Sequence, residues 1–291
     1  IDKACERFGY EVLMVDNGDG STQELVAKCF PNVKIVPSQG NVGFAAGNNW
    51  LARKAKGRFL LLLNPDVELK ANAVDILLEA SSEYPSASAW GGVTLDATGV
   101  PDVGNTVQVP SLREMASRVL GRSIAGLTEG KTFDSDEQAS TLSGGFVLIS
   151  RVAWDEAGGL DERYFLYCEE VDFFYRLGLD GHSFWRIADA RAHHDIGHGQ
   201  VVSPMRALYQ AAGIMQFARL HWGPAHKFSA FVLMWLAAWQ RFVVGSLLKR
   251  RGLRFAALAK SNRRLALSPN DWRFGYDPQR GLLAKLKQSS A

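Results

Sequence analysis

The fold class follows from the stretch Phe59-Leu60-Leu61-Leu62-Leu63-Asn64-Pro65-Asp66. Five consecutive apolar residues predict a strand that is buried on both faces, as in the central strand of a parallel α/β sheet. Asn64-Pro65-Asp66 then forms a short loop that leaves a carboxylate beyond the end of this strand. Ligands of open α/β sheets bind at this edge, which makes Asp66 a candidate binding residue. An Asp in such a place more often caps a helix or a turn, so other loops must support the hypothesis.

Strand-like and helix-like segments alternate on both sides of this strand. Apolar runs at 11–15 and 33–36 predict strands, and Ser21 or Thr22 is the expected N-cap of a helix between them. The alternation predicts an α/β protein with a Rossmann-like, doubly wound, mainly parallel sheet. Further strands are expected at 87–93, 142–150 and 183–187, further helices at 41–56, 71–83, 172–179 and 205–221, and loops with one short helix within 96–141.

The composition is that of a globular chain with ample material for a core. Of its 291 residues, 47% are hydrophobic and 22% are charged, which excludes disordered, collagen-like and disulfide-rich proteins. Cys5, Cys29 and Cys168 are far apart and odd in number, so they predict neither a disulfide framework nor a zinc site. A reducing compartment is the expected environment.

The C-terminal part differs from the rest in charge and hydropathy. Residues 241–291 contain 12 Lys and Arg but only two Asp, whereas the first 240 residues carry a net charge of −7. The most apolar segment, Phe228–Leu248, is interrupted by Gln240 and Arg241. A membrane span needs about 20 apolar residues with few charges, which favours a helix lying on an anionic membrane surface over a span. A helix packed against the protein is the other alternative.

Nucleic acid is not an expected partner of the basic tail. Trp272, Phe274 and Tyr276 do not alternate with the basic residues in the pattern of a single-strand binding platform.

A glycine-rich loop supports the hypothesis of a binding site. The segment Asn41–Asn48 contains Gly43 and Gly47, which allow the backbone to approach a ligand closely. Its spacing matches neither the P-loop nor the dinucleotide motif, so the loop alone is weak evidence.

A second polar cluster gathers Glu169, Glu170 and Asp172 among aromatic residues. Mutual repulsion between such carboxylates raises a pKa toward that of a general base. The alternative is a helix N-terminus enriched in acidic residues. Gly144 and Gly145 precede this cluster on a strand edge that leaves room for a sugar or a backbone contact.

His193 and His194 follow a strand-like segment. Neighbouring residues of a strand point to opposite faces, so at most one of these imidazoles faces the site. An imidazole is a plausible metal ligand beside Asp66, although a single His more often packs or caps.

These motifs, taken in order, resemble those of the family 2 glycosyltransferases. The resemblance covers roughly residues 8–225 and is closest to the rhamnosyltransferase-like branch. It implies a GT-A fold that binds a nucleotide-sugar donor with Mg²⁺ or Mn²⁺. The motifs are Val15-Asp16-Asn17, Asn41-x-Gly43-Phe44-Ala45 with Asn48, Asn64-Pro65-Asp66-Val67, Ser143-Gly144-Gly145, Phe165-Leu166-Tyr167-x-Glu169-Glu170-Val171-Asp172 and His194.

The resemblance also implies roles for single residues. Asp66 and His194 would hold the metal, with His193 as the alternative imidazole. Glu170 stands at the position of the catalytic base, where the family usually has Asp; Glu169 is a lesser candidate, and Asp172 supports the loop. The donor would be bound by Asp16, Asn17, Asn41, Gly43, Phe44, Asn48, Asn64, Gly144, Gly145 and Arg176.

The expected function is that of an inverting, metal-dependent glycosyltransferase at the cytoplasmic face of the cell membrane. The resemblance implies dTDP-rhamnose or a UDP-sugar as donor and a cell-surface polysaccharide or lipid-linked glycan as acceptor. Residues 1–225 would form the transferase domain, whose first family strand is expected to precede this chain. Residues 226–291 would form a helical, membrane-associating extension. A catalytically inactive, membrane-docked module that binds nucleotide-sugars is the alternative.

Overall fold

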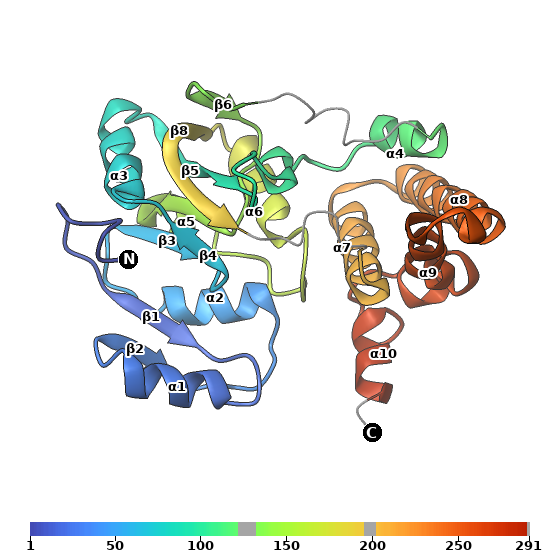
Figure 1. The fold of residues 1–291 in the computed structure, drawn as a ribbon, viewed down its shortest axis with the longest axis horizontal. Coiled ribbons are helices and arrows are strands. Elements are labelled where there is room, and N and C mark those ends of the chain that lie inside the picture. Colours follow the sequence, from blue (N-terminus) through green and yellow to red (C-terminus); the bar gives the residue numbers. More distant parts are fainter. Residues whose placement is uncertain (122–131, 195–201, 290–291) are drawn as a thin grey trace. The chain divides into compact units, whose positions relative to one another are not determined.

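The computed structural model describes residues 1–121, 132–194 and 202–289, which belong to two compact units (Figure 1). The α/β unit comprises Ile1–Val109, Gly130–Glu162 and Glu170–His198. The helical unit comprises Pro110–Glu129, Arg163–Glu169 and Gly199–Ala291. The helical unit contains three separate segments, whereas the predicted extension is the single segment 226–291. The predicted domain boundary near residue 225 stays a prediction.

The α/β unit begins with two parallel strands, β1 (Val12–Val15) and β2 (Val33–Val36). Helix α1 (Ser21–Cys29) connects them, as the alternation of the sequence predicts. The predicted side-chain cap of α1 is wrong, because Gly20 is the N-cap and neither Ser21 nor Thr22 has that place. Helix α2 (Phe44–Ala52) follows β2 and contacts β1.

The larger sheet has the strand order β3-β7-β5-β8-β4, with β6 paired to β8. Strand β7 is antiparallel to both β3 and β5, whereas β8 is parallel to β5. Strands β3, β5 and β8 therefore run in one direction, and the sheet as a whole is mixed. The bounds are β3 (Phe59–Leu63), β4 (Val67–Leu69), β5 (Ala87–Leu95), β6 (Glu137–Ala139), β7 (Phe146–Ser150) and β8 (Ser183–His194).

Both faces of the larger sheet are covered, as the apolar sequence of β3 predicts. Leu60 and Leu62 belong to a core that includes buried residues of α2, α5 (Arg151–Glu156) and α6 (Glu169–Leu179). Leu61 packs against the core on the other face, to which α3 (Ala73–Glu83) contributes. Alternate residues of one strand thus serve two cores, and the polar residues that follow β3 are held on a rigid support.

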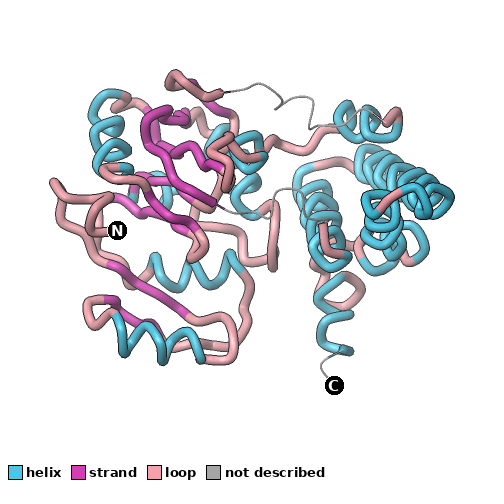
Figure 2. The backbone as a smooth tube through the Cα atoms, viewed as in Figure 1, coloured by secondary structure: helices cyan, strands magenta, loops and turns pink. Residues whose placement is uncertain are grey.

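The described part of the helical unit contains no strand (Figure 2). Helix α7 (Pro204–His221) begins after Ser203, whose hydroxyl accepts a hydrogen bond from the backbone N–H of Arg206. Proline at the first helical position suits this start, because its missing N–H would have no helical partner there. The other helices are α4 (Leu112–Val119), α8 (Pro224–Leu248), α9 (Leu253–Leu267) and α10 (Leu282–Ser289).

Helix α8 packs against α9 through small side chains. A Cβ atom at Gly245 would lie 2.5 Å from the backbone nitrogen of Ala259, so the two helices approach closely at this point. The buried residues of α8 are Ala230, Ala237, Ala238 and Gly245. By length and composition, the helical stretch Pro224–Arg251 could cross a membrane, and only 17% of its most apolar window is buried.

Candidate active site

The end of β3 and the end of β8 bring two predicted metal ligands together. Asp66 lies between β3 and β4, and β4 pairs with β8 so that Val67 is opposite His194. His194 Nε2 lies 3.4 Å from Asp66 Oδ1, and the Asp66 side chain is 63% exposed. The structure therefore places His194, and not the adjacent His193, against Asp66. A role for this pair in binding a metal stays a prediction.

A third residue of this group, Asp102, was missed by the sequence analysis. Its side chain is fully buried, and its Oδ2 lies 3.6 Å from Nδ1 of His194. The buried Asp102 carboxylate is the largest influence that raises the pKa of His194 above its ordinary value, with burial acting against it and Asp66 adding to it. Asp102 lies in a segment predicted only as loop, and nothing in the local sequence indicates its proximity to residue 194.

The pair of Asp66 and His194 fits a divalent cation that also binds substrate. Mg²⁺ and Mn²⁺ accept carboxylate oxygens, Mn²⁺ also accepts imidazole, and both usually keep several positions for water or phosphate oxygens. In the described ranges 1–121, 132–194 and 202–289, no group of three or more His, Cys, Asp or Glu side chains could hold a metal. Asp66 and His194 offer two ligands of the kinds that such a cation accepts, and a cation of this type can take its remaining ligands from water or phosphate oxygens.

Five other predicted residues lie close to one another, and one of them, Asn64, is in the same loop as Asp66. The backbone N–H of Asn64 donates to the carbonyl of Gly145 at 3.0 Å. A Cβ atom at Gly144 would lie 3.5 Å from both the Phe44 ring and Cβ of Glu170. The glycines therefore let the loop after β3, the start of α2 and the start of α6 come close together.

Glu170 has the properties expected of a general base. Its Oε2 is inaccessible to solvent and has no hydrogen-bond partner among the described residues. Burial raises the pKa of this carboxyl above its ordinary value. The predicted direction is confirmed, but its predicted cause is wrong, because desolvation replaces carboxylate repulsion as the reason.

The neighbours of Glu170 in α6 are engaged in local structure. The fully buried Asp172 carboxylate accepts a hydrogen bond from Arg176 Nε at 2.7 Å. Arg176 also donates to the carbonyls of Ala157 and Gly159, which ties α6 to the end of α5. Asp172 is thus paired within α6, whereas its predicted support of the catalytic loop and donor binding by Arg176 stay predictions.

Glu169, the lesser candidate for the base, is the first residue of α6 and follows a strained loop. Tyr167 and Cys168 have φ angles of 67° and 72°, in the left-handed region that side chains rarely occupy. Glu169 itself is buried, with 3% of its surface exposed. Consecutive strained residues persist only where surrounding structure fixes them, which is common next to functional groups.

The predicted nucleotide-binding loops also lie side by side. Asn17 Nδ2 donates to the carbonyl of Gly43 at 3.0 Å, and Gly43 starts α2 with a φ of 86°. Asp16 is turned toward its own loop, where its carboxylate accepts the backbone N–H groups of Gly18 and Gln23 at 2.6 and 3.1 Å. It thereby supplies the start of α1 with the acceptor that Gly20 lacks.

The other two predicted residues of these loops support the backbone. Asn41 Oδ1 accepts the N–H of Gly43 at 3.2 Å, and Asn48 Nδ2 donates to the carbonyl of Phe44 at 2.9 Å. An amide side chain carries both a donor and an acceptor, so each of these two can make a further hydrogen bond.

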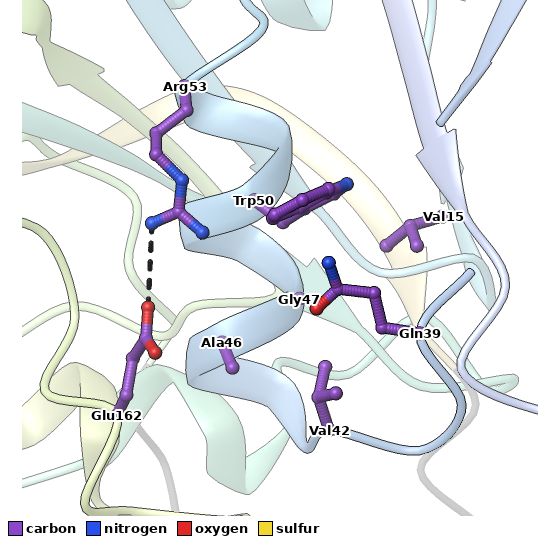
Figure 3. Close-up of a pocket in the computed structure, with 8 residues that line it drawn as sticks. All are labelled: Val15, Gln39, Val42, Ala46, Gly47, Trp50, Arg53 and Glu162. Atoms are coloured by element: carbon purple, nitrogen blue, oxygen red, sulfur yellow. Dashed lines mark ion pairs between the residues drawn. The ribbon is translucent and has the colours of Figure 1, made fainter. Parts of the chain in front are cut away.

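A small cavity lies behind these loops, between the end of β1 and α2 (Figure 3). An ion pair of 3.5 Å between Arg53 and Glu162 crosses its rim. Its volume of about 80 Å³ is far below the roughly 300 Å³ at which small-molecule pockets begin. At this volume the cavity is too small to hold a nucleotide by itself. None of the predicted site residues lines it. It is lined by Val15, Gln39, Val42, Ala46, Gly47, Trp50, Arg53 and Glu162.

Comparison with known proteins places this arrangement in context. A sequence model of glycosyl transferase family 2 matches residues 1–155. The chain is 31% identical over 213 residues to N-acetylglucosaminyl-diphospho-decaprenol L-rhamnosyltransferase of Mycobacterium tuberculosis (strain ATCC 25618 / H37Rv), covering 64% of this chain and 67% of that protein. It is 25% identical over 201 residues to rhamnosyltransferase WbbL of Escherichia coli (strain K12), covering 64% and 74%.

A solved structure supports the predicted fold. The crystal structure of GalNAc-T7 with UDP, GalNAc and Mn²⁺ aligns with a TM-score of 0.52 and 15% identity. The alignment covers 89% of this chain and half the length of GalNAc-T7. The predicted GT-A fold is confirmed, and an identity this low carries the likeness no further than the fold.

Proposed function

This chain belongs to glycosyl transferase family 2, as its motifs predict, and we propose that it transfers L-rhamnose from a nucleotide-sugar to a lipid-linked glycan. The chain is a glycosyltransferase. The observation that carries the proposal is that Gly144 and Gly145 contact Glu170 and Asn64, respectively, and that the loop of Asn64 also holds Asp66, which lies against His194. Such a site offers a base for the acceptor on one side and ligands for a metal–diphosphate on the other.

The names of two relatives support this donor and this acceptor. Both are rhamnosyltransferases, and one acts on an N-acetylglucosaminyl-diphospho-decaprenol. We therefore infer dTDP-rhamnose as the donor, ahead of a UDP-sugar, and a glycan on a polyprenyl diphosphate as the acceptor.

The reaction requires one displacement with inversion at the anomeric carbon. Glu170 removes the proton of the acceptor hydroxyl while its oxygen attacks the anomeric carbon, and the bond to the diphosphate oxygen breaks. The buried environment that raises the Glu170 pKa makes its carboxylate a stronger base. Asp66 and His194 would hold Mg²⁺ or Mn²⁺, which when bound neutralises the charge on the departing diphosphate.

We further propose that the enzyme acts at the inner face of the cell membrane, where a lipid-linked acceptor is accessible. Helix α8 exposes large apolar side chains and is followed by the exposed cations Lys249, Arg250 and Arg251. Apolar insertion and attraction to anionic lipid act together in peripheral membrane proteins. The indole of Trp235 in α8 donates to the carbonyl of Ala266 in α9 at 2.9 Å, so its polar atom faces α9.

A transfer assay tests the proposed reaction. The purified protein is given dTDP-rhamnose, UDP-glucose or UDP-galactose, Mn²⁺ and an N-acetylglucosaminyl-diphospho-polyprenol acceptor. We expect product with dTDP-rhamnose, and a loss of about 10²–10⁴-fold in kcat for Glu170→Gln, because the amide cannot accept the proton. Glu68→Gln, an exposed substitution on β4, is the matched control with unchanged kcat.

Two outcomes of this assay contradict the proposal. Full activity of Glu170→Gln would remove Glu170 from the role of base and leave Glu169 as the candidate. Donor binding without transfer by the unmodified protein would favour the inactive nucleotide-sugar-binding module.

A further inference from the structure

Three side chains form a line across the candidate metal site. Asp102 Oδ2 lies 3.6 Å from His194 Nδ1, and Asp66 Oδ1 lies 3.4 Å from His194 Nε2 on the opposite edge of the ring. The outer carboxylate is largely exposed, whereas the Asp102 side chain is fully buried. The imidazole therefore separates a buried acid from a solvent-facing one.

The two oxygens of Asp102 have different surroundings. Oδ1 accepts the backbone N–H of Gly104 at 2.6 Å and so caps the short helical turn Val103–Thr106. Oδ2 has no hydrogen bond within the described part of the chain, and it faces Nδ1 of His194 at 3.6 Å. A cap requires only one acceptor, which Asn or Ser supplies without burying a charge. The turn alone does not account for a carboxylate here.

The hydrogen-bonding chemistry of the His194 imidazole indicates a role for Oδ2 of Asp102. A neutral imidazole carries its proton on one nitrogen and a lone pair on the other, and a carboxylate only accepts hydrogen bonds. With its proton on Nδ1 facing Asp102, the ring presents the lone pair of Nε2 toward Asp66. Two acceptors then face each other across 3.4 Å, an arrangement that a cation between them stabilises. Metal-binding histidines commonly have such a partner on their other nitrogen.

We propose that Asp102 is a positioning residue, which fixes the tautomer and orientation of His194 so that Nε2 can bind the metal of the donor site. This inference rests on the proposed function, because it assigns a role to a residue behind the proposed metal ligand. The proposed role gives the fully buried Asp102 side chain no direct contact with metal or sugar.

The substitution Asp102→Asn tests this role with little change in shape. The amide oxygen can remain on Gly104, which directs the NH₂ group toward His194 and moves the ring proton to Nε2. Asp96→Asn is the matched control, because Asp96 caps the neighbouring loop through Thr98 and Val100. Asp102→Ser is a second variant that retains a capping oxygen but no carboxylate.

Two measurements on the full chain report the effect of these substitutions on His194 and on the metal. The nitrogen chemical shifts of the His194 ring, measured by NMR without metal, report its tautomer. Mn²⁺ titration in the presence of dTDP, followed by the electron paramagnetic resonance of free Mn²⁺, reports metal affinity. We expect the Nδ1–H form in the unmodified protein and the Nε2–H form in Asp102→Asn. Mn²⁺ affinity should fall by about 10–100-fold in both Asp102 variants and remain unchanged in Asp96→Asn.

The possible failures are distinguishable. An unchanged tautomer or an unchanged Mn²⁺ affinity in folded Asp102→Asn would overturn the positioning role while leaving the transferase site intact. Absence of Mn²⁺-dependent dTDP binding in the unmodified protein would overturn the proposed metal site and with it this role.

Discussion

The α/β unit buries charged side chains, whereas the helical unit exposes large apolar ones. In the α/β unit, the carboxylates of Asp102 and Asp172 are fully buried and face His194 and Arg176. In the helical unit, α8 exposes 68% of Phe228 and 76% of Leu247. Burying a charge and exposing a large apolar side chain are both unfavourable in water, so each needs a compensating partner. For the carboxylates the partner lies within the unit, whereas for α8 we propose a membrane.

Helices α7 and α8 show the same contrast within one unit. The buried positions of α7 include Leu208, Met215 and Phe217, whereas those of α8 are only alanine and glycine. Four of the exposed large apolar residues of α8 lie on one face, namely Phe228, Leu236, Val243 and Leu247. We call these four residues the exposed α8 face. Their spacing of eight, seven and four places them on one side of the helix.

The largest expected effect concerns the buried charge of the α/β unit. Arg176→Ala removes the guanidinium that pairs with Asp172 and releases the carbonyls of Ala157 and Gly159. We expect the free energy of unfolding to fall by about 3 kcal/mol, because a buried carboxylate loses its cation. Urea denaturation measures this change. Lys34→Ala, which removes an exposed ion pair with Glu11, is the control and should cost less than about 1 kcal/mol.

The next prediction concerns the helical unit. Replacing Phe228, Leu236 and Leu247 by Ser should weaken binding to vesicles that contain phosphatidylglycerol by at least about tenfold, because apolar burial in the bilayer is lost. Sedimentation with vesicles measures the bound fraction. Leu25→Ser removes an equally exposed apolar residue from α1 and should leave binding unchanged. Equal binding by the triple variant would show that the exposed α8 face is not the docking surface.

The smallest expected effect concerns Asp277, a carboxylate of the helical unit that can be compared with the buried carboxylates of the α/β unit. Backbone N–H groups of Gln279 and Arg280 lower the pKa of Asp277 to about 2, and Arg280 and Arg219 add to this. A lowered folded-state pKa stabilises the protein above the ordinary value of 3.8, and this contribution disappears as the pH falls through about 2. Asp277→Asn should therefore lose about 1 kcal/mol at pH 7. Urea denaturation at several pH values should show the difference shrinking between pH 4 and pH 2, and a constant difference would contradict this account.

Local patterns predict much of this molecule. The apolar run 59–63 gives β3 and its two cores, and the helix expected at 205–221 is α7. The strand expected at 183–187 continues to His194, because a register shift between Gly92 and Val93 lets β8 stay paired with β5. That longer strand is what aligns His194 with Asp66.

Long-range contacts explain what the sequence left open. The choice between His193 and His194 depends on the register of β8 against β4, which no local pattern fixes. Asp102 was overlooked because it meets His194 across 92 positions of the chain. The predicted cause of the raised Glu170 pKa was wrong for a similar reason, because the burial that raises this pKa depends on residues distant in sequence.

The central claim is that Asp66 holds the metal through which a nucleotide donor binds. Calorimetric titration of dTDP, UDP and GDP, with and without Mn²⁺, tests it on the unmodified protein, on Asp66→Ala and on the exposed control Glu68→Ala. The account predicts that dTDP binds only with Mn²⁺, equally to the unmodified protein and to Glu68→Ala, and at least about 100-fold more weakly to Asp66→Ala. Mn²⁺-independent binding, equal binding by Asp66→Ala, or no binding of any nucleotide to the folded protein would contradict it.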